Sequence, residues 1–82
     1  MYRIETDSNA MEQIAALPDD APAAYAQVLG VLELVPWNGD PLHEDNPDGA
    51  VRTLPFGRAG MVTYLILEDQ RRVDVLNVVW AG

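Results

Sequence analysis

Two arginines, a tyrosine and a histidine are the residues of this chain best suited to chemistry on a phosphate group. Arg52 and Arg58 can bind a phosphate and stabilise the negative charge that develops on it. Tyr64 can position a base or donate a proton, and His43, in a loop upstream of Arg52, is a candidate general base. The same residues also have structural interpretations. The arginines can pair with acidic side chains, and Tyr64 can be a core residue whose hydroxyl is satisfied inside the protein.

A metal site is not expected. His43 is followed directly by Glu44 and Asp45, but the chain has no second histidine and no pair of ligands at helical spacing. Cysteine is absent, which excludes disulfides and thiolate zinc sites. We therefore expect no metal and no cofactor, and we interpret residues 43–45 as a solvated loop.

Three apolar residues are candidates for contact with a protein partner. Trp37 follows Pro36, where an indole can bind a partner or a base, or can instead fill the end of a helix. Trp80 ends the last expected strand, at the edge of the core or at an interface. Met61 belongs to a strand that is apolar on both faces, and one layer of helices covers only one face of a sheet.

Length and charge limit the classes of function. The chain has 82 residues, so we expect one domain over residues 1–82. Thirteen acidic residues oppose five arginines, lysine is absent, and the net charge is −8. Such a surface repels nucleic acid unless its arginines cluster, and it favours a basic protein partner or serves solubility alone. No run approaches the ~20 apolar residues of a membrane span, and the N-terminus lacks a signal-peptide core, so we expect a cytoplasmic protein that does not contact a membrane.

The first half of the sequence predicts a strand followed by two helices. Residues 2–5 alternate between polar and apolar, as in a short strand. Asp7, Ser8 and Asn9 are all good N-cap residues, and Asn9 with Glu12 resembles a capping box at the start of a first helix, which Pro18 ends. A second helix begins after the next two aspartates and ends at Pro36. It carries apolar residues at the spacing i, i+3, i+4, i+7, namely Tyr25, Val28, Leu29 and Leu32.

The second half predicts a loop and three strands. The segment 36–49 has three prolines and two glycines and is expected to be a long loop without a strand. The strands are expected at 50–54, 61–67 and 73–80, with a turn at 57–60 and a polar connection at 68–72. The resulting order, β-α-α-β-β-β, predicts an α+β fold in which an antiparallel sheet carries a helical hairpin on one face. A second copy, giving a homodimer, or a partner segment could cover part of the other face.

The element order and several short motifs resemble the RelE/ParE toxin superfamily. The motifs include an Arg-x-Leu strand at Arg52 and Leu54, a glycine-bearing turn, a strand centred on Tyr64, an acidic turn and a valine-rich last strand. The N-terminal YRIE and the pair Leu17-Pro18 are similar as well. The resemblance spans nearly the whole chain.

This resemblance implies the toxin of a type II toxin–antitoxin pair. Such toxins cleave messenger RNA in the ribosomal A site or poison gyrase, and the C-terminal segment of a cognate antitoxin wraps and neutralises them. In the nucleases of the family the ribose 2′-oxygen attacks the phosphate, so groups are needed that move protons and stabilise negative charge. By this resemblance Arg52 and Arg58 would hold the phosphate, with Tyr64 or His43 nearby.

The chain departs from the nucleases of the family at two places. They carry an arginine three residues before the strand tyrosine, where this chain has Met61. They also carry basic or aromatic residues just after the last strand, where this chain has only Trp80, Ala81 and Gly82. These departures favour an alternative, a non-catalytic protein-binding module on the same fold.

Overall fold

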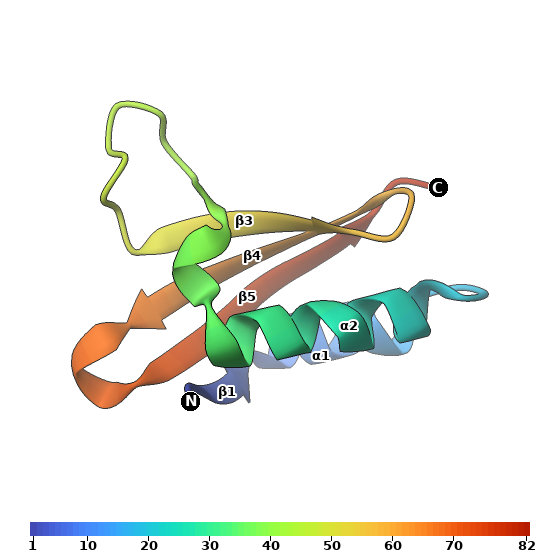
Figure 1. Ribbon diagram of the computed structural model, residues 1–82. Coiled ribbons are helices and arrows are strands. Elements are labelled where there is room, and N and C mark those ends of the chain that lie inside the picture. Colours follow the sequence, from blue (N-terminus) through green and yellow to red (C-terminus); the bar gives the residue numbers. More distant parts are fainter.

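A pair of antiparallel helices covers one face of a five-stranded sheet in the computed structural model, which describes residues 1–82 (Figure 1). In chain order the elements are β1 (Arg3–Thr6), α1 (Ser8–Ala15), α2 (Ala21–Leu34), the 3-10 turn η1 (Pro36–Asn38), β2 (Asp40–Pro41), β3 (Val51–Phe56), β4 (Gly60–Leu67), the 3-10 turn η2 (Glu68–Gln70) and β5 (Arg72–Trp80). The predicted α+β class and the helical hairpin on one face are confirmed. Neither helix is long and apolar enough to cross a membrane.

The sheet has the strand order β1-β5-β4-β3-β2 and is mixed. The pairs β2–β3, β3–β4 and β4–β5 are antiparallel, but β1 runs parallel to β5, with Ile4 opposite Val73. The prediction of a wholly antiparallel sheet was therefore wrong at this edge. The chain leaves β1 directly into α1 rather than through a hairpin, so no tight turn requires β1 to run antiparallel to its neighbour.

Alternate residues of the central strands build the core. Val62, Tyr64 and Ile66 of β4 face the helices, and a bulge between Thr63 and Tyr64 adjusts the register of β4 with β5. The predicted apolar stripe of the second helix is confirmed, with Tyr25, Val28 and Leu32 buried and Leu29 packed against them. The largest fully buried side chains come from β4, β5 and α2, with Pro36 of η1, and they fix the position of the sheet on the helices.

Two polar side chains fix α1: one caps its first turn, and the other connects it to β5. Asp7 is the N-cap and accepts a hydrogen bond from the backbone N–H of Asn9 at 3.0 Å, so the predicted capping box that starts at Asn9 was wrong. Gln13 accepts a hydrogen bond from the Val78 N–H at 2.6 Å and donates one to Asn77 Oδ1 at 2.7 Å. Because β1 pairs only with the first part of β5, this amide satisfies an edge that is otherwise open.

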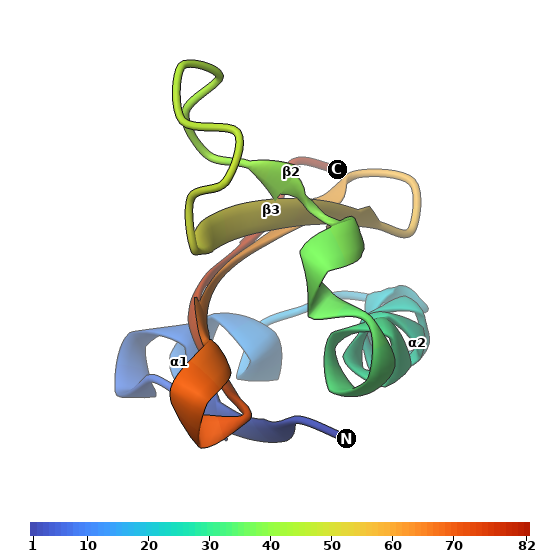
Figure 2. The ribbon, with the colours of Figure 1, turned by 60° about the vertical axis from the view of Figure 1, so that its left-hand side comes forward.

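The segment 36–49 contains short regular structure that the sequence did not predict. η1 and the two-residue strand β2 precede the loop, and β2 pairs with β3 through Asp40 and Thr53. The expectation of a loop without a strand was therefore wrong. Pro41 is tolerated because β2 is an edge strand. The rest of the loop lies on the other side of β3 from the two helices (Figures 1 and 2).

Candidate functional site

Arg52 holds the long loop to the sheet. It lies on β3, directly opposite Tyr64, and its side chain faces the helices with only 8% of the residue exposed. Its guanidinium stacks 4.8 Å from the centroid of the Trp37 ring. It also donates to four backbone carbonyls of the preceding segment, those of Pro47 at 2.6 Å, Gly39 at 2.9 Å, Gly49 at 3.0 Å and Trp37 at 3.3 Å. In this arrangement the guanidinium N–H groups of Arg52 donate to carbonyls of the protein itself rather than to a ligand.

Tyr64 has the same kind of role on the neighbouring strand. It is completely buried, and its hydroxyl donates a hydrogen bond of 2.6 Å to the carbonyl of Pro36. Burial raises the pKa of this phenol above 10.0, and the positive charge of Arg52 offsets part of that effect. Gly39 fits beneath the ring only because it has no side chain, since a Cβ there would meet the Tyr64 hydroxyl. The structure thus places Tyr64 in the core, as a support for η1.

Arg58 is the one arginine whose N–H groups have no protein acceptor. Arg52 is bound to carbonyls, and the other three arginines pair with carboxylates. Arg58 is exposed in the turn between β3 and β4, and its guanidinium lies 5.3 Å from the centroid of the Trp80 ring. Trp80 packs on Phe56 with 5.7 Å between ring centroids, and its indole N–H is buried without an acceptor.

The four predicted catalytic residues do not form one site. Arg52 and Tyr64 are adjacent, but both are buried. His43 is exposed in the loop that precedes β3, and Arg58 follows the other end of that strand. A strand of this length spans about 20 Å, so the imidazole and the free guanidinium are far apart. No group of three or more His, Cys, Asp or Glu side chains is arranged to hold a metal ion.

The face of the sheet opposite the helices is uncovered, and we call it the open face. Met61, paired with Val79 across β4 and β5, is 42% exposed, and Val79 is 45% exposed. Leu76, the extra residue at the bulge, is 37% exposed. Partly buried apolar residues on the same face are Val51, Leu65 and Leu67. Met61 is therefore exposed on this face, and its neighbours extend the apolar surface.

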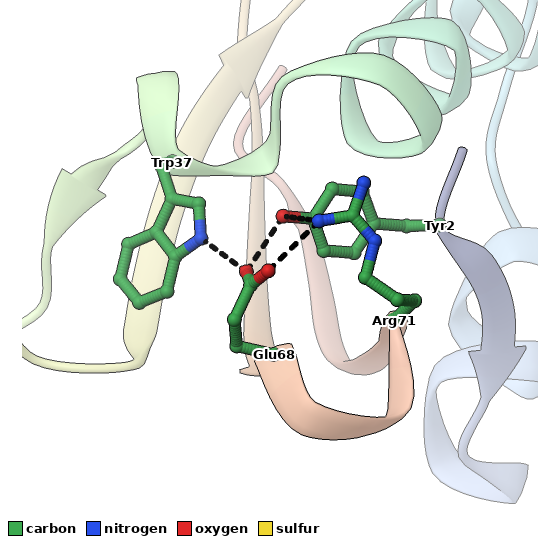
Figure 3. Close-up of polar contacts among 4 residues, drawn as sticks. All are labelled: Tyr2, Trp37, Glu68 and Arg71. Carbon is green, nitrogen blue, oxygen red and sulfur yellow. Dashed lines mark hydrogen bonds and ion pairs between the residues drawn. The ribbon is translucent and has the colours of Figure 1, made fainter.

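Glu68 is the centre of a polar cluster that the sequence did not predict. The Glu68 carboxylate accepts hydrogen bonds from Tyr2 Oη at 2.6 Å, Trp37 Nε1 at 2.8 Å and Arg71 Nη1 at 2.8 Å (Figure 3). These bonds, that from Tyr2 first, lower the pKa of Glu68 from 4.5 to about 2. The sequence predicted only a polar connection at 68–72, and it could not indicate the contact with Tyr2, which is 66 residues away from Glu68 in the chain. The cluster joins the N-terminus, η1 and η2.

The Trp37 side chain is accordingly held on two sides. Its N–H bonds to Glu68, its ring carries Arg52, and it remains 39% exposed. It does not fill the end of α2, which was the structural alternative considered from the sequence. Trp37 and Trp80 lie at different places in the molecule, and neither is part of the apolar surface around Met61.

By sequence, no protein-family model and no curated protein matches the chain. Comparison of structures gives close similarity. The isolated RelE toxin of E. coli superposes with a TM-score of 0.80 at 14% identity, over 100% of this chain and 86% of that chain. The chain has the RelE fold. A chain of the intact E. coli RelBE toxin–antitoxin complex matches with a TM-score of 0.81 at 13% identity, over 100% and 99% of the two chains. The RelBE2 complex of Mycobacterium tuberculosis gives 0.72 at 20% identity, over 96% and 90%.

These findings confirm the predicted RelE-like fold and leave two surfaces for function. One is the exposed guanidinium of Arg58, which lies over the half-buried Trp80 ring and can bind an anion. The other is the open face, which has apolar side chains and no acid or base that could transfer a proton at its centre. A surface of that composition is suited to contact with a protein.

Proposed function

We propose that this chain is the toxin component of a type II toxin–antitoxin pair and that a cognate antitoxin binds and neutralises it. The observation that carries the proposal is the match of the whole chain to a chain of the E. coli RelBE complex, at a TM-score of 0.81 over 100% and 99% of the two chains. Solved RelE structures also include one with a peptide of the RelB antitoxin. The open face of this chain supplies apolar surface for such a partner.

The proposed cellular action is inhibition of translation or of gyrase. If the toxin cleaves messenger RNA on the ribosome, Arg58 is the arginine that can reach a phosphate, because the N–H groups of Arg52 are bound to the loop carbonyls. His43 is exposed and can supply a proton acceptor only if the substrate extends along β3. The contacts of Arg52 and Tyr64 support a role for them in holding the loop that carries His43.

Growth of a bacterial host after tightly controlled induction of the full chain tests the proposal. We expect growth arrest, with Arg58→Ala relieving the arrest if the target is RNA. Arg3→Ala is the matched control, because Arg3 is also exposed but its guanidinium faces Glu5 at 3.5 Å. Mapping of messenger RNA ends and a gyrase supercoiling assay with purified protein then separate the two targets. Normal growth in hosts that contain soluble, folded protein would contradict the toxin proposal.

A second candidate is a non-catalytic protein-binding module on the same fold. It is favoured by the internal use of Arg52 and Tyr64 and by the separation of His43 from Arg58. For this candidate we expect a stoichiometric complex with a protein partner, intact messenger RNA and unimpaired growth. Cleavage of messenger RNA by the wild-type chain but not by the Arg58→Ala variant would rule out this second candidate.

A further inference from the structure

The open face is an apolar floor between two acidic borders. The floor centres on Met61 and Val79, and the half-buried Leu65 and Val51 lie further along β4 and β3 toward the loop. Between these two apolar pairs lies a row of uncharged polar residues, Thr53, Thr63 and Asn77. Of the thirteen acidic side chains, three are in ion pairs with arginine, which leaves ten without a basic partner. Where these acids lie relative to the floor determines what can bind there.

The first border is a hollow of about 320 Å³ at the β1–β5 edge. Three acids line it, Glu5, Asp7 and Asp74, together with Arg72, and Glu5 faces a second arginine, Arg3, at 3.5 Å. Arg72 is already bound to Asp74 by two hydrogen bonds of 2.8 and 3.0 Å. Asp7, the N-cap of α1, is therefore the one acid of this hollow without a basic partner, and the hollow has room for a further cation.

The second border lies at the opposite edge, beside β2 and β3. The loop there carries four acids, Asp40, Glu44, Asp45 and Asp48. None of them forms a side-chain hydrogen bond or an ion pair, and His43 is the only basic residue among them. Arg52 anchors this loop through four of its carbonyls, so the acids are presented on a segment that is held in place.

Charge excludes most occupants of this floor. A second copy of the chain would bring another net charge of −8 to the same surface, and a nucleic acid would bring phosphates. An acidic peptide is disfavoured for the same reason. A basic segment with an apolar side satisfies both the floor and the borders. The borders lie at the two edges of five strands, about 19 Å apart, which a helix of about 13 residues crosses.

We infer that the open face binds a basic amphipathic segment of a protein partner, with its apolar residues on Met61 and Val79 and its lysines or arginines at the two acidic borders. The inference rests on the proposed function in one respect: if the chain is a toxin, the partner is its antitoxin. It predicts that the neutralising segment of that antitoxin is basic, because this toxin is acidic.

Methyl NMR tests the inference, since the three methionines report on different places. Met61 reports on the open face, Met11 on the groove between α1 and β1, and Met1 on the N-terminus. The probes are two amphipathic peptides of about 20 residues with the same leucine face, one with lysines and one with glutamates on the polar face. We expect saturable shifts of the Met61 methyl with the lysine peptide alone, and weaker binding as salt rises.

Two sets of variants localise the binding. Neutralising the loop acids in D40N/E44Q/D45N/D48N should weaken the lysine peptide about tenfold. The matched control E12Q/D19N/D20N/E33Q removes the same charge from the helical side and should change the affinity much less. Val79→Lys places a positive charge on the floor and should abolish the peptide-induced shift of the Met61 methyl signal. Met61 is unchanged in this variant, so its signal remains observable. The loop variant and the control variant change only side chains that form no hydrogen bond or ion pair within the protein, so we expect both to keep the fold.

The outcomes separate this inference from the proposed function. Equal binding of the glutamate peptide, shifts at Met11 instead of Met61, or equal effects of the two charge variants would overturn the inference. A Met61 shift in a protein that leaves growth unimpaired would keep the docking surface and reject the toxin. Growth arrest with an unresponsive Met61 would keep the toxin and reject the basic partner segment.

Discussion

Replacement of Tyr64 by phenylalanine distinguishes a structural from a catalytic tyrosine. The substitution keeps the buried ring and removes the 2.6 Å hydrogen bond from the hydroxyl to the Pro36 carbonyl. A buried acceptor that loses its partner costs about 1–3 kcal/mol. The carbonyl keeps a longer contact of 3.4 Å from the Gly39 N–H. We therefore expect the lower part of that range, about 1–2 kcal/mol of the free energy of unfolding.

Tyr25→Phe is the matched control. Tyr25 is also buried, with 5% exposed, but its hydroxyl has no hydrogen-bond partner. Removal of an unsatisfied buried hydroxyl should leave the free energy of unfolding unchanged or raise it. Urea and thermal unfolding of the two variants measure the difference. Because 1 kcal/mol corresponds to roughly 4–8 °C in a domain of this size, the Tm of Tyr64→Phe should fall by at least about 4 °C relative to Tyr25→Phe.

The reasoning would be refuted if Tyr64→Phe were as stable as wild type, or no less stable than Tyr25→Phe. A variant with unchanged stability that no longer arrests growth would show that the hydroxyl acts on a target and not on η1. An unchanged denaturant m-value is also expected, since neither substitution changes the surface exposed on unfolding.

Three further predictions follow from the other buried or shared contacts. Arg52→Lys keeps the charge but cannot reach four carbonyls, so we expect faster hydrogen exchange in residues 36–49, and unchanged exchange there would contradict the anchoring role. Folding lowers the pKa of Glu68 from 4.5 to about 2. The ionised carboxylate therefore adds to the free energy of unfolding in full above about pH 5, and this stabilisation is lost as the pH falls toward 2. Urea unfolding of Glu68→Gln should then show a deficit at pH 7 that shrinks in acid, and a deficit independent of pH would be inconsistent with this linkage. Gly39→Ala puts a Cβ 2.8 Å from a backbone oxygen and should lower the free energy of unfolding by about 1–3 kcal/mol. Gly30→Ala meets nothing within 4 Å and should raise it by about 1 kcal/mol. Thermal unfolding measures both, and equal effects would refute the packing argument.

Much of the fold could be predicted from local pattern. The spacing of Tyr25, Val28 and Leu32 predicted the buried stripe of α2, because helical periodicity places those side chains on one side whatever they pack against. Alternation in β4 and β5 predicted two long strands to within about one residue at each end. Elements shorter than one pattern repeat, such as β2, could not be predicted, since pairing with β3 creates them.

The candidate site shows the opposite balance. The residue types of Arg52, Arg58, Tyr64 and His43 determined which chemistry the chain could attempt, and the composition alone determined that its surface is acidic. Only the tertiary structure decided that Arg52 and Tyr64 are used by loop carbonyls, that Arg58 is free, and that Glu68 meets Tyr2. The physical reason is that helix and strand periodicity act over a few residues. The partner of a polar side chain, by contrast, depends on which distant segments the sheet topology brings within hydrogen-bond distance.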